Sequence, residues 1–377
     1  MDLDFTEEQD MLRNSARDFL STECDKATVR EIEEGEDGYS PEIWRKTAEL
    51  GWQGLMIPEE YDGMGMGLMD LLVVFEEIGR NILPSPFLAT VALGAPPIVE
   101  AGTEEMKKDI LPKIATGEAI LTLALTEPSA GYSADCVELK AEAKGADFVL
   151  NGTKLFVEFA SASDHMVVVA RTKSGGDPAQ GITLFLVDSK SPGVKIEPFT
   201  TTGTDKQCEV VFDNVSVPKS AVIGQVDKGW PIVEKTLRIA TVAKLAEMCG
   251  GMQAVLDMSV AYAKERVQYG RPIGSYQAIQ HMLADMFIRV FTSKNILYEA
   301  AWMAAEGMDC DAKLSTAKAW CNEAYKKVAE DGVQVHGAIG TTRDHDMGLY
   351  YRRAMAAFPT FGDTGDHREV VAQSLGL

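Results

Sequence analysis

The chain has 377 residues, 46% hydrophobic and 25% charged, which is the composition of a globular protein with a large buried core. This composition excludes disordered and collagen-like proteins. The formal net charge of −21 excludes the basic surface that nucleic acid or an anionic membrane requires. The six scattered cysteines include no CxxC pair, which indicates reduced thiols and neither a disulfide framework nor a metal site.

No stretch of the sequence approaches the roughly 18 consecutive apolar residues of a membrane-spanning helix. The chain starts with the acidic segment Met1-Asp2-Leu3-Asp4, which lacks the basic and apolar regions of a secretory signal. We therefore expect a cytoplasmic protein.

Residues 1–120 are predicted to form an N-terminal helical domain. Residues 6–9 (TEEQ) combine an N-cap hydroxyl with acidic first-turn residues, and apolar residues then recur on one helical face. Ser40-Pro41-Glu42 is a second helix start, with a cap followed by proline.

Residues 121–225 are predicted to form a middle β domain. Short apolar runs at 148–150, 166–170, 182–187 and 209–212 are separated by turn residues, a pattern typical of antiparallel strands. Asn151-Gly152 is expected to be a tight hairpin turn.

Residues 226–377 return to helical periodicity. The segments 232–263 and 275–305 are long enough to predict a helical bundle. The expected fold class is therefore mainly α with a middle β domain.

Three motifs point to one family. Residues 125–131 read LTEPSAG, residues 266–270 read RVQYG, and residues 334–338 read QVHGA. They resemble the TEPGAG, RxxFG and QxxGG segments of the flavin-dependent acyl-CoA dehydrogenases, and the resemblance covers essentially the whole chain. It implies an N-terminal helical domain, a β-barrel-like middle domain and a C-terminal four-helix bundle.

The same resemblance implies FAD as the cofactor. Leu125 and Thr126 would offer backbone donors and a hydroxyl to the pyrimidine edge of the flavin, and Arg266 would reach the pyrophosphate of a FAD held by a neighbouring subunit. The other residues that match cofactor contacts are Gln277, Gln334, His336, Gly337 and Thr364. Taken singly, the motifs also fit plain structural roles: a β-turn, an arginine at a helix end and a helix histidine.

Two residues depart from the family at the flavin. Phe156 stands where the best-known members have a tryptophan, and Glu158 stands where they have a threonine that bonds flavin N5. Phe156 can still cover the flavin face. An ionised Glu158 beside N5 would oppose an anionic reduced flavin, so we expect Glu158 to point away or to be protonated.

Neither usual position of the family's proton-abstracting glutamate holds a carboxylate. Gly362 matches the C-terminal position, and Ala240 matches the position on the long helix after the β domain. Glu247 lies seven residues after Ala240, within about 20° of the same helical face and about 10 Å further along.

We predict Glu247 as the general base, reaching the same cavity as Ala240 with a pKa raised by its apolar neighbours. A position at a solvent-facing helix edge is the structural alternative, and Asp363 is the competing base. The carboxylate at position 247 and the C-terminal segment with Gly362 and Asp363 resemble those of a family subgroup. That subgroup acts on bulky, branched, alicyclic or steroid side-chain CoA thioesters.

The implied reaction is FAD-dependent α,β-dehydrogenation of an acyl-CoA thioester to the 2-enoyl-CoA. A carboxylate would abstract the α-proton, and hydride would pass to flavin N5. The implied setting is degradation of fatty or alicyclic acids by a homotetramer or dimer that delivers electrons to an electron-transfer flavoprotein. Two alternatives stay open: a non-catalytic or half-site subunit of a heterotetramer, and a flavin enzyme with another reaction on CoA thioesters, such as reduction or elimination.

Overall fold

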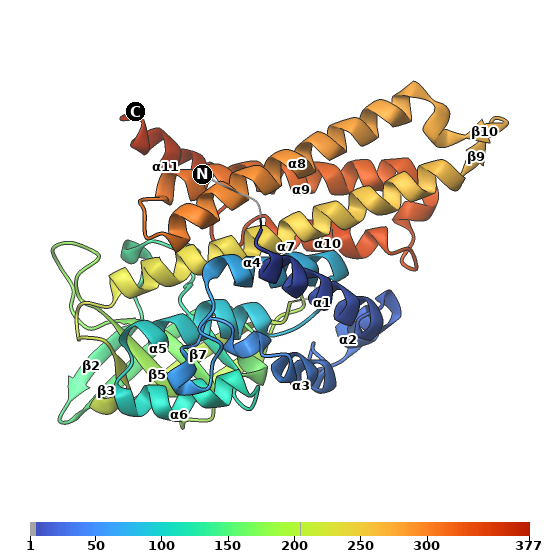
Figure 1. Cartoon of the computed structure of the whole chain (residues 1–377). Coiled ribbons are helices and arrows are strands. Elements are labelled where there is room, and N and C mark those ends of the chain that lie inside the picture. The colour runs from blue at the N-terminus through green and yellow to red at the C-terminus, as the bar shows by residue number, and fades with distance from the viewer. Residues whose placement is uncertain (1–4, 204) are drawn as a thin grey trace.

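The computed structural model describes residues 5–203 and 205–377 and divides into a helical, a β and a second helical part in chain order (Figure 1). This confirms the expected fold class. The helices of the N-terminal part are α1 (Glu7–Glu23), α2 (Lys26–Glu34), α3 (Pro41–Glu49), α4 (Leu68–Asn81), the π-helix Leu88–Gly94, α5 (Ala95–Ala101) and α6 (Glu104–Ala115).

The two predicted helix starts of this part are confirmed. Thr6 Oγ1 accepts the Gln9 N–H at 3.2 Å, and Gln9 Oε1 accepts the Thr6 N–H at 3.1 Å, which completes a capping box before α1. Ser40 Oγ accepts the Ile43 N–H at 3.3 Å at the start of α3. Each cap satisfies an amide that has no partner within its helix.

The middle part is an eight-stranded sheet with the order β6-β7-β3-β2-β4-β5-β8, and β1 pairs with β4 off this path. Most pairs are antiparallel, as predicted, but the β1–β4 and β2–β4 pairs are parallel. The strands are β1 (Leu121–Ala124), β2 (Lys140–Lys144), β3 (Asp147–Glu158), β4 (His165–Arg171), β5 (Ile182–Asp188), β6 (Val194–Pro198), β7 (Gln207–Pro218) and β8 (Val222–Ile223).

The predicted hairpin turn at Asn151-Gly152 is wrong. Strand β3 runs through both residues, and its register with β7 shifts between Leu150 and Gly152. Gly152 has φ +148°, and Asn151 Oδ1 accepts the Asn214 N–H of β7 at 2.9 Å. The pair therefore forms a β-bulge, whose unusual backbone glycine permits. The turn between β2 and β3 lies just before it, at residues 145–146.

The C-terminal part is built around α7 (Trp230–Glu265). This helix is long and apolar enough to cross a membrane by length and composition alone, but 89% of its most apolar window is buried in the protein, as in the core helix of a bundle. Around it pack α8 (Gln277–Ala305), α9 (Asp311–His336) and α10 (Met347–Ala357), and α11 (Thr364–Ser374) packs on α9. The two-residue strands β9 (Val267–Gln268) and β10 (Arg271–Pro272) extend beyond the end of α7.

Helix α4 docks directly on α7, and glycines make this possible. A Cβ on Gly79 of α4 would overlap the backbone of Glu247, and a Cβ on Gly250 of α7 would overlap the backbone of Glu76. The two backbones therefore meet at this crossing. A single hydrophobic core spans the N-terminal part and the bundle.

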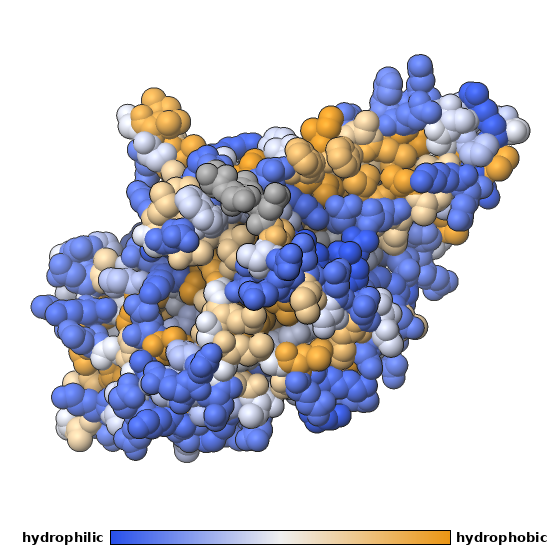
Figure 2. Space-filling model, in the orientation of Figure 1, coloured by the Kyte–Doolittle hydropathy of each residue, from blue (hydrophilic) through white to orange (hydrophobic). Residues whose placement is uncertain are grey.

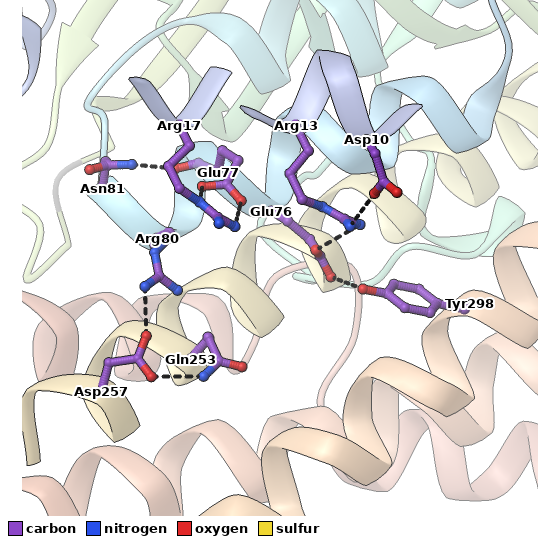
Figure 3. Close-up of polar contacts among 10 residues, drawn as sticks. All are labelled: Asp10, Arg13, Arg17, Glu76, Glu77, Arg80, Asn81, Gln253, Asp257 and Tyr298. Atoms are coloured by element: carbon purple, nitrogen blue, oxygen red, sulfur yellow. Dashed lines mark hydrogen bonds and ion pairs between the residues drawn. The ribbon is translucent and has the colours of Figure 1, made fainter. Parts of the chain in front are cut away.

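Polar contacts around α4 join four helices at this crossing (Figure 3). Arg17 of α1 pairs with the buried Glu77 at 2.7 Å, and Tyr298 of α8 donates to Glu76 at 2.6 Å. Arg80 pairs with Asp257 of α7 at 2.6 Å. Because buried carboxylates need such partners, these contacts fix how the N-terminal part sits on the bundle.

Candidate active site

A cavity of about 350 Å³ lies where the three parts of the chain meet. Its walls are mostly apolar, with a few polar groups, as is usual for small-molecule sites. They include Leu93 from the N-terminal part, Leu237 from α7, residues 355–361 from the end of α10 and the segment after it, and four residues singled out from the sequence: Leu125, Thr126, Phe156 and Glu158.

The segment after β1 that carries Leu125 and Thr126 is held by a buried ion pair. Lys154 Nζ of β3 donates to Glu127 Oε1 at 2.6 Å and to the Leu125 carbonyl at 2.8 Å. The Glu127 carboxylate also accepts the backbone N–H groups of Glu138 and Leu139 at 3.0 Å each. Burial lowers the pKa of Lys154 to about 8, against the opposing effect of Glu127. The segment is thus fixed to β3 at the edge of the cavity.

Phe156 reaches the cavity through a second irregularity in β3. The register between β3 and β7 shifts between Lys154 and Val157, and Phe156 has φ +54°. Its ring is 49% exposed and lies 5.7 Å from the Phe199 ring. A bulge of this kind re-aims a side chain, and here it leaves an aromatic face open to the cavity.

Glu158, at the end of β3, faces the cavity and is buried. The expectation that it points away is therefore wrong, whereas a protonated state is consistent with its surroundings. Burial raises the pKa of Glu158 to about 7; Lys244 opposes this shift, and Asp205 and Glu247 add to it. Within the described residues its carboxyl oxygens have no hydrogen-bond partner, and only its backbone carbonyl accepts a hydrogen bond, from Thr122 Oγ1.

Glu247 is buried on α7, but its surroundings differ from the expectation. Its Oε2 accepts from Lys244 Nζ and its Oε1 from Arg353 Nη1 of α10, both at 2.8 Å. Burial alone would raise the pKa of Glu247, but Lys244 and Arg353 outweigh it and lower that pKa. The prediction that the pKa of Glu247 is raised is therefore wrong. The residue is also absent from the described lining of the larger cavity, and its role as base stays a prediction.

Glu247 instead lines a small adjoining cavity of about 20 Å³. Glu158 and Asp205 line both cavities. Five ionisable side chains gather here, which we call the buried charge cluster: Glu158, Asp205, Lys244, Glu247 and Arg353. Three of its members, Asp205, Lys244 and Arg353, were not predicted from the sequence. Lys244 could have been found, since it lies one helical turn before Glu247, but no local signal marks Asp205 or Arg353.

The competing base, Asp363, serves as the N-cap of α11. Its Oδ1 accepts the N–H groups of Gly365 at 2.6 Å and Asp366 at 3.0 Å, and the residue is exposed. Gly362 has φ +104°, and a Cβ there would lie 3.0 Å from His367 Nε2. The backbone at this position therefore suits glycine, and the carboxylate beside it is occupied in capping.

Two further residues fit a ligand site. Tyr132, which the sequence analysis missed although it follows the LTEPSAG motif, lines the larger cavity and packs edge-on against Phe361 at 5.9 Å. Thr364 is buried, and its hydroxyl has no hydrogen-bond partner among the described residues. Because a buried hydroxyl without a partner is costly, a ligand atom is a fitting partner for it.

The remaining predicted cofactor residues lie at the other end of the bundle. Arg266 and Gln277 flank β9 and β10, at the end of the bundle opposite the β domain (Figure 1). His336 belongs to the same end, since its ring stacks on Tyr262 of α7 at 4.5 Å. Gln334 and Gly337 are exposed beside it, and no atom of the described residues lies within 4 Å of where a Cβ on Gly337 would be. Within one chain, the predicted FAD residues therefore form two groups, one at the larger cavity and one around Arg266 at the other end of the bundle.

An apolar surface lies on α8 (Figure 2). Phe287, Ile288 and Phe291 are 57%, 56% and 59% exposed, and the two phenylalanine rings stack at 6.0 Å. Beyond them, Tyr269 beside β9 is 94% exposed. Large apolar groups gathered in this way mark contact surfaces.

Known proteins match the whole chain. Family models described as the N-terminal, middle and C-terminal domains of acyl-CoA dehydrogenase match residues 6–118, 122–215 and 227–376. The probable acyl-CoA dehydrogenase YngJ of Bacillus subtilis is 31% identical over 100% of both chains. The chain belongs to the acyl-CoA dehydrogenase family. It is therefore an oxidoreductase that acts on acyl-CoA.

Other known proteins match the chain over a similar extent. A 3-(aryl)acrylate reductase of Clostridium sporogenes is 33% identical over 98% of this chain and 99% of its own. The butyryl-CoA dehydrogenase structure from Megasphaera elsdenii superposes with a TM-score of 0.93 at 28% identity, covering 100% of both chains. The structure of PigA with FAD and proline superposes with a TM-score of 0.94 at 25% identity, covering 100% of both chains.

Membership implies FAD, and the residues present fit it. The cavity offers the open ring of Phe156 and the Thr126 hydroxyl, while the Thr364 hydroxyl and the open space at Gly337 are suited to a further ligand. The guanidinium of Arg266 is exposed and can bind a pyrophosphate in a fork of two hydrogen bonds.

Proposed function

We propose that this protein is a FAD-dependent dehydrogenase that converts an acyl-CoA thioester to its 2-enoyl-CoA. The observation that carries the proposal is the cavity at the junction of the three parts. There Glu158, a buried carboxyl group with no hydrogen-bond partner among the described residues, lies beside the predicted flavin residues. Bound FAD would accept the hydride that leaves the substrate's β carbon.

The chain's own residues supply binding, orientation and proton transfer. Leu125, Thr126 and Phe156 would contact the flavin, since the Lys154–Glu127 pair fixes the first two and the β3 bulge presents the third. Apolar walls such as Leu93 and Leu237 would exclude water from the reacting carbons. The proton acceptor is a carboxyl group of the buried charge cluster, where Glu247 is the candidate predicted from the sequence.

Assembly would complete the cofactor site. The split between the cavity residues and the group around Arg266, together with the apolar surface on α8, supports a homotetramer or dimer in which one chain completes the FAD site of another. An electron-transfer flavoprotein would accept the electrons. A branched or alicyclic acyl group is favoured by Ala240 and Gly362 at the two usual base positions, although neither residue lines the larger cavity.

The reverse reaction is a second candidate. A carboxyl group with a pKa of about 7 is present in both its protonated and its ionised form near neutral pH, so Glu158 can give as well as take a proton. A relative named as a reductase of 3-(aryl)acrylates favours testing this direction on enoyl-CoA thioesters with an aryl group.

The test uses the full chain as purified, without oxygen. The visible spectrum shows first whether the chain alone carries FAD, which separates a complete enzyme from a half-site subunit. A panel of straight, branched, alicyclic and aryl acyl-CoA thioesters is then added, and we expect one class to bleach the flavin and to lose two hydrogens by mass spectrometry. Reoxidation of the photoreduced protein by enoyl-CoA, with no bleaching by any acyl-CoA, would instead show a reductase.

A further inference from the structure

Glu158 and Glu247, two of the three buried carboxyl groups of the cluster, differ in what they touch. Both oxygens of Glu247 are engaged, one by Lys244 and one by Arg353. The carboxyl oxygens of Glu158 accept no hydrogen bond from any described residue, although the side chain is buried. A proton can reach the oxygens of Glu158 from the larger cavity, whereas at Glu247 it would have to displace an ammonium or a guanidinium.

The elements around Glu158 contribute charges of both signs. Helix α7 contributes Lys244 and Glu247, helix α10 contributes Arg353, and the segment before β7 contributes Asp205. The phenol of Tyr132 lies in the same larger cavity. With Glu158 ionised, three carboxylates face two cations, and with Glu158 protonated the charges balance. In a dry environment the balanced state is favoured, so the cluster is set up to hold one exchangeable proton.

Building on the proposed function, we infer that Glu158 is the carboxyl group that takes up and releases the substrate proton in the cavity, while Glu247 stays ionised as its charge partner. In dehydrogenation the α C–H bond breaks and its proton passes to a carboxylate oxygen of Glu158. The electron pair of that bond forms the new double bond as the β hydride leaves, and FAD, when bound, would supply the acceptor for that hydride. In the reverse direction the protonated Glu158 returns the proton to the α carbon.

The directions in which the pKa values of Glu158 and Glu247 shift agree with this geometry. Burial raises the pKa of Glu158 to about 7, near the working pH at which a general acid or base is most effective. The pKa of Glu247 moves the other way, because its two cationic partners outweigh burial. Asp205 is the remaining carboxylate of both cavities: its Oδ2 accepts from Gln207 Nε2 at 2.6 Å, and its buried Oδ1 has no partner among the described residues, so the Asp205→Asn variant below is needed to distinguish it from Glu158.

The test is a pH titration of the FAD-bound full chain followed by infrared difference spectroscopy. It measures the carbonyl absorption of protonated carboxyl groups and needs no substrate. We expect a band that disappears as the pH rises, with a midpoint of about 7, and its loss in Glu158→Gln. Asp363→Asn is the control, because its carboxylate is exposed and serves as a helix cap.

Two variants test the proposed partnership. Glu247→Gln leaves the positive charges of Lys244 and Arg353 beside Glu158 and should lower the midpoint by about half a pH unit or more. If that variant does not fold, Asp205→Asn should lower the midpoint in the same direction, because the Asp205 charge raises the pKa of Glu158. A purely structural Glu158 would show no titrating band.

The inference would be overturned if the band persisted in Glu158→Gln. It would also be overturned if the band disappeared in Asp205→Asn or Glu247→Gln while remaining in Glu158→Gln. These outcomes are independent of the reaction. If no CoA thioester reacts while the band titrates as expected, the proposed function fails and the proton-exchanging carboxyl group stands.

Discussion

Glu158 and Glu247 line the same small cavity, yet the pKa values of their carboxyl groups shift in opposite directions. Both side chains are buried, so burial alone does not explain the difference. Glu247 has two cations at 2.8 Å, and Glu158 has no hydrogen-bond partner for its carboxyl among the described residues. One carboxyl group is therefore held as a fixed charge, and the other is left to titrate.

The stability of the protein should depend on the pH through Glu158. Its pKa rises from 4.5 to about 7 on folding, so its favourable contribution is complete below pH 4.5 and is lost as the pH rises through 7. Between about pH 5 and pH 8 the wild type should lose roughly 2.5 kcal/mol more unfolding free energy than Glu158→Gln. Denaturant unfolding at each pH measures this, and parallel pH profiles for the two proteins would contradict it.

Glu247→Gln should destabilise the fold strongly at every pH near neutrality. The change leaves Lys244 and Arg353 buried without their shared carboxylate, which typically costs about 3–5 kcal/mol. The matched control is Asp257→Asn, which breaks the partly exposed pair with Arg80 and should cost about 1 kcal/mol or less. Denaturant unfolding compares the two, and equal losses would refute a charge role for Glu247.

Lys154→Met should lower the FAD content of the purified protein. Glu127 loses its buried cation, and the Leu125 carbonyl loses a donor, so the segment with Leu125 and Thr126 is no longer fixed to β3. Lys140→Met, at an exposed position of the neighbouring strand β2, is the control. The ratio of flavin to protein absorbance is the measurement. Full FAD content in Lys154→Met would mean that this segment does not hold the flavin.

Phe291→Asp should reduce both the size of the assembly and its FAD content. The change places a charge in the apolar surface of α8, and separated chains would lose the Arg266 group of their neighbour. The control is Asp285→Asn, at an exposed position of the same helix. Light scattering and the flavin spectrum are recorded on one sample, and an unchanged mass with full FAD would exclude this surface as the contact.

The features predicted from the sequence are those that depend on nearby residues. Thr6 and Ser40 cap helices through amides three residues away, and the long helical periods at 232–263 and 275–305 predict a helical bundle. Asn151-Gly152 was misjudged because its conformation depends on pairing with β7, about 60 residues later in the chain.

In the candidate site, too, the sequence predicts the features that depend on nearby residues and not those that depend on distant ones. Leu125 and Thr126, which the LTEPSAG motif predicts as flavin contacts, both line the cavity, because one short segment carries them. The partners of Glu247 could be found only in part: Lys244 lies three residues away, whereas Arg353 is 106 residues away. The pKa of a buried carboxyl group depends on such distant charges, so the sequence alone could not distinguish Glu247 from Glu158 as the titrating group.

The rate of flavin reduction in stopped flow tests the mechanism most directly. An acyl-CoA that bleaches the wild-type flavin is mixed, without oxygen, with wild type, Glu158→Gln and Asp363→Asn at equal FAD content. We expect Glu158→Gln to reduce its flavin about 100-fold more slowly or worse, and Asp363→Asn to stay within a few-fold of wild type, as suits a helix cap. Wild-type rates in Glu158→Gln, or a loss confined to Asp363→Asn, would contradict proton transfer by Glu158.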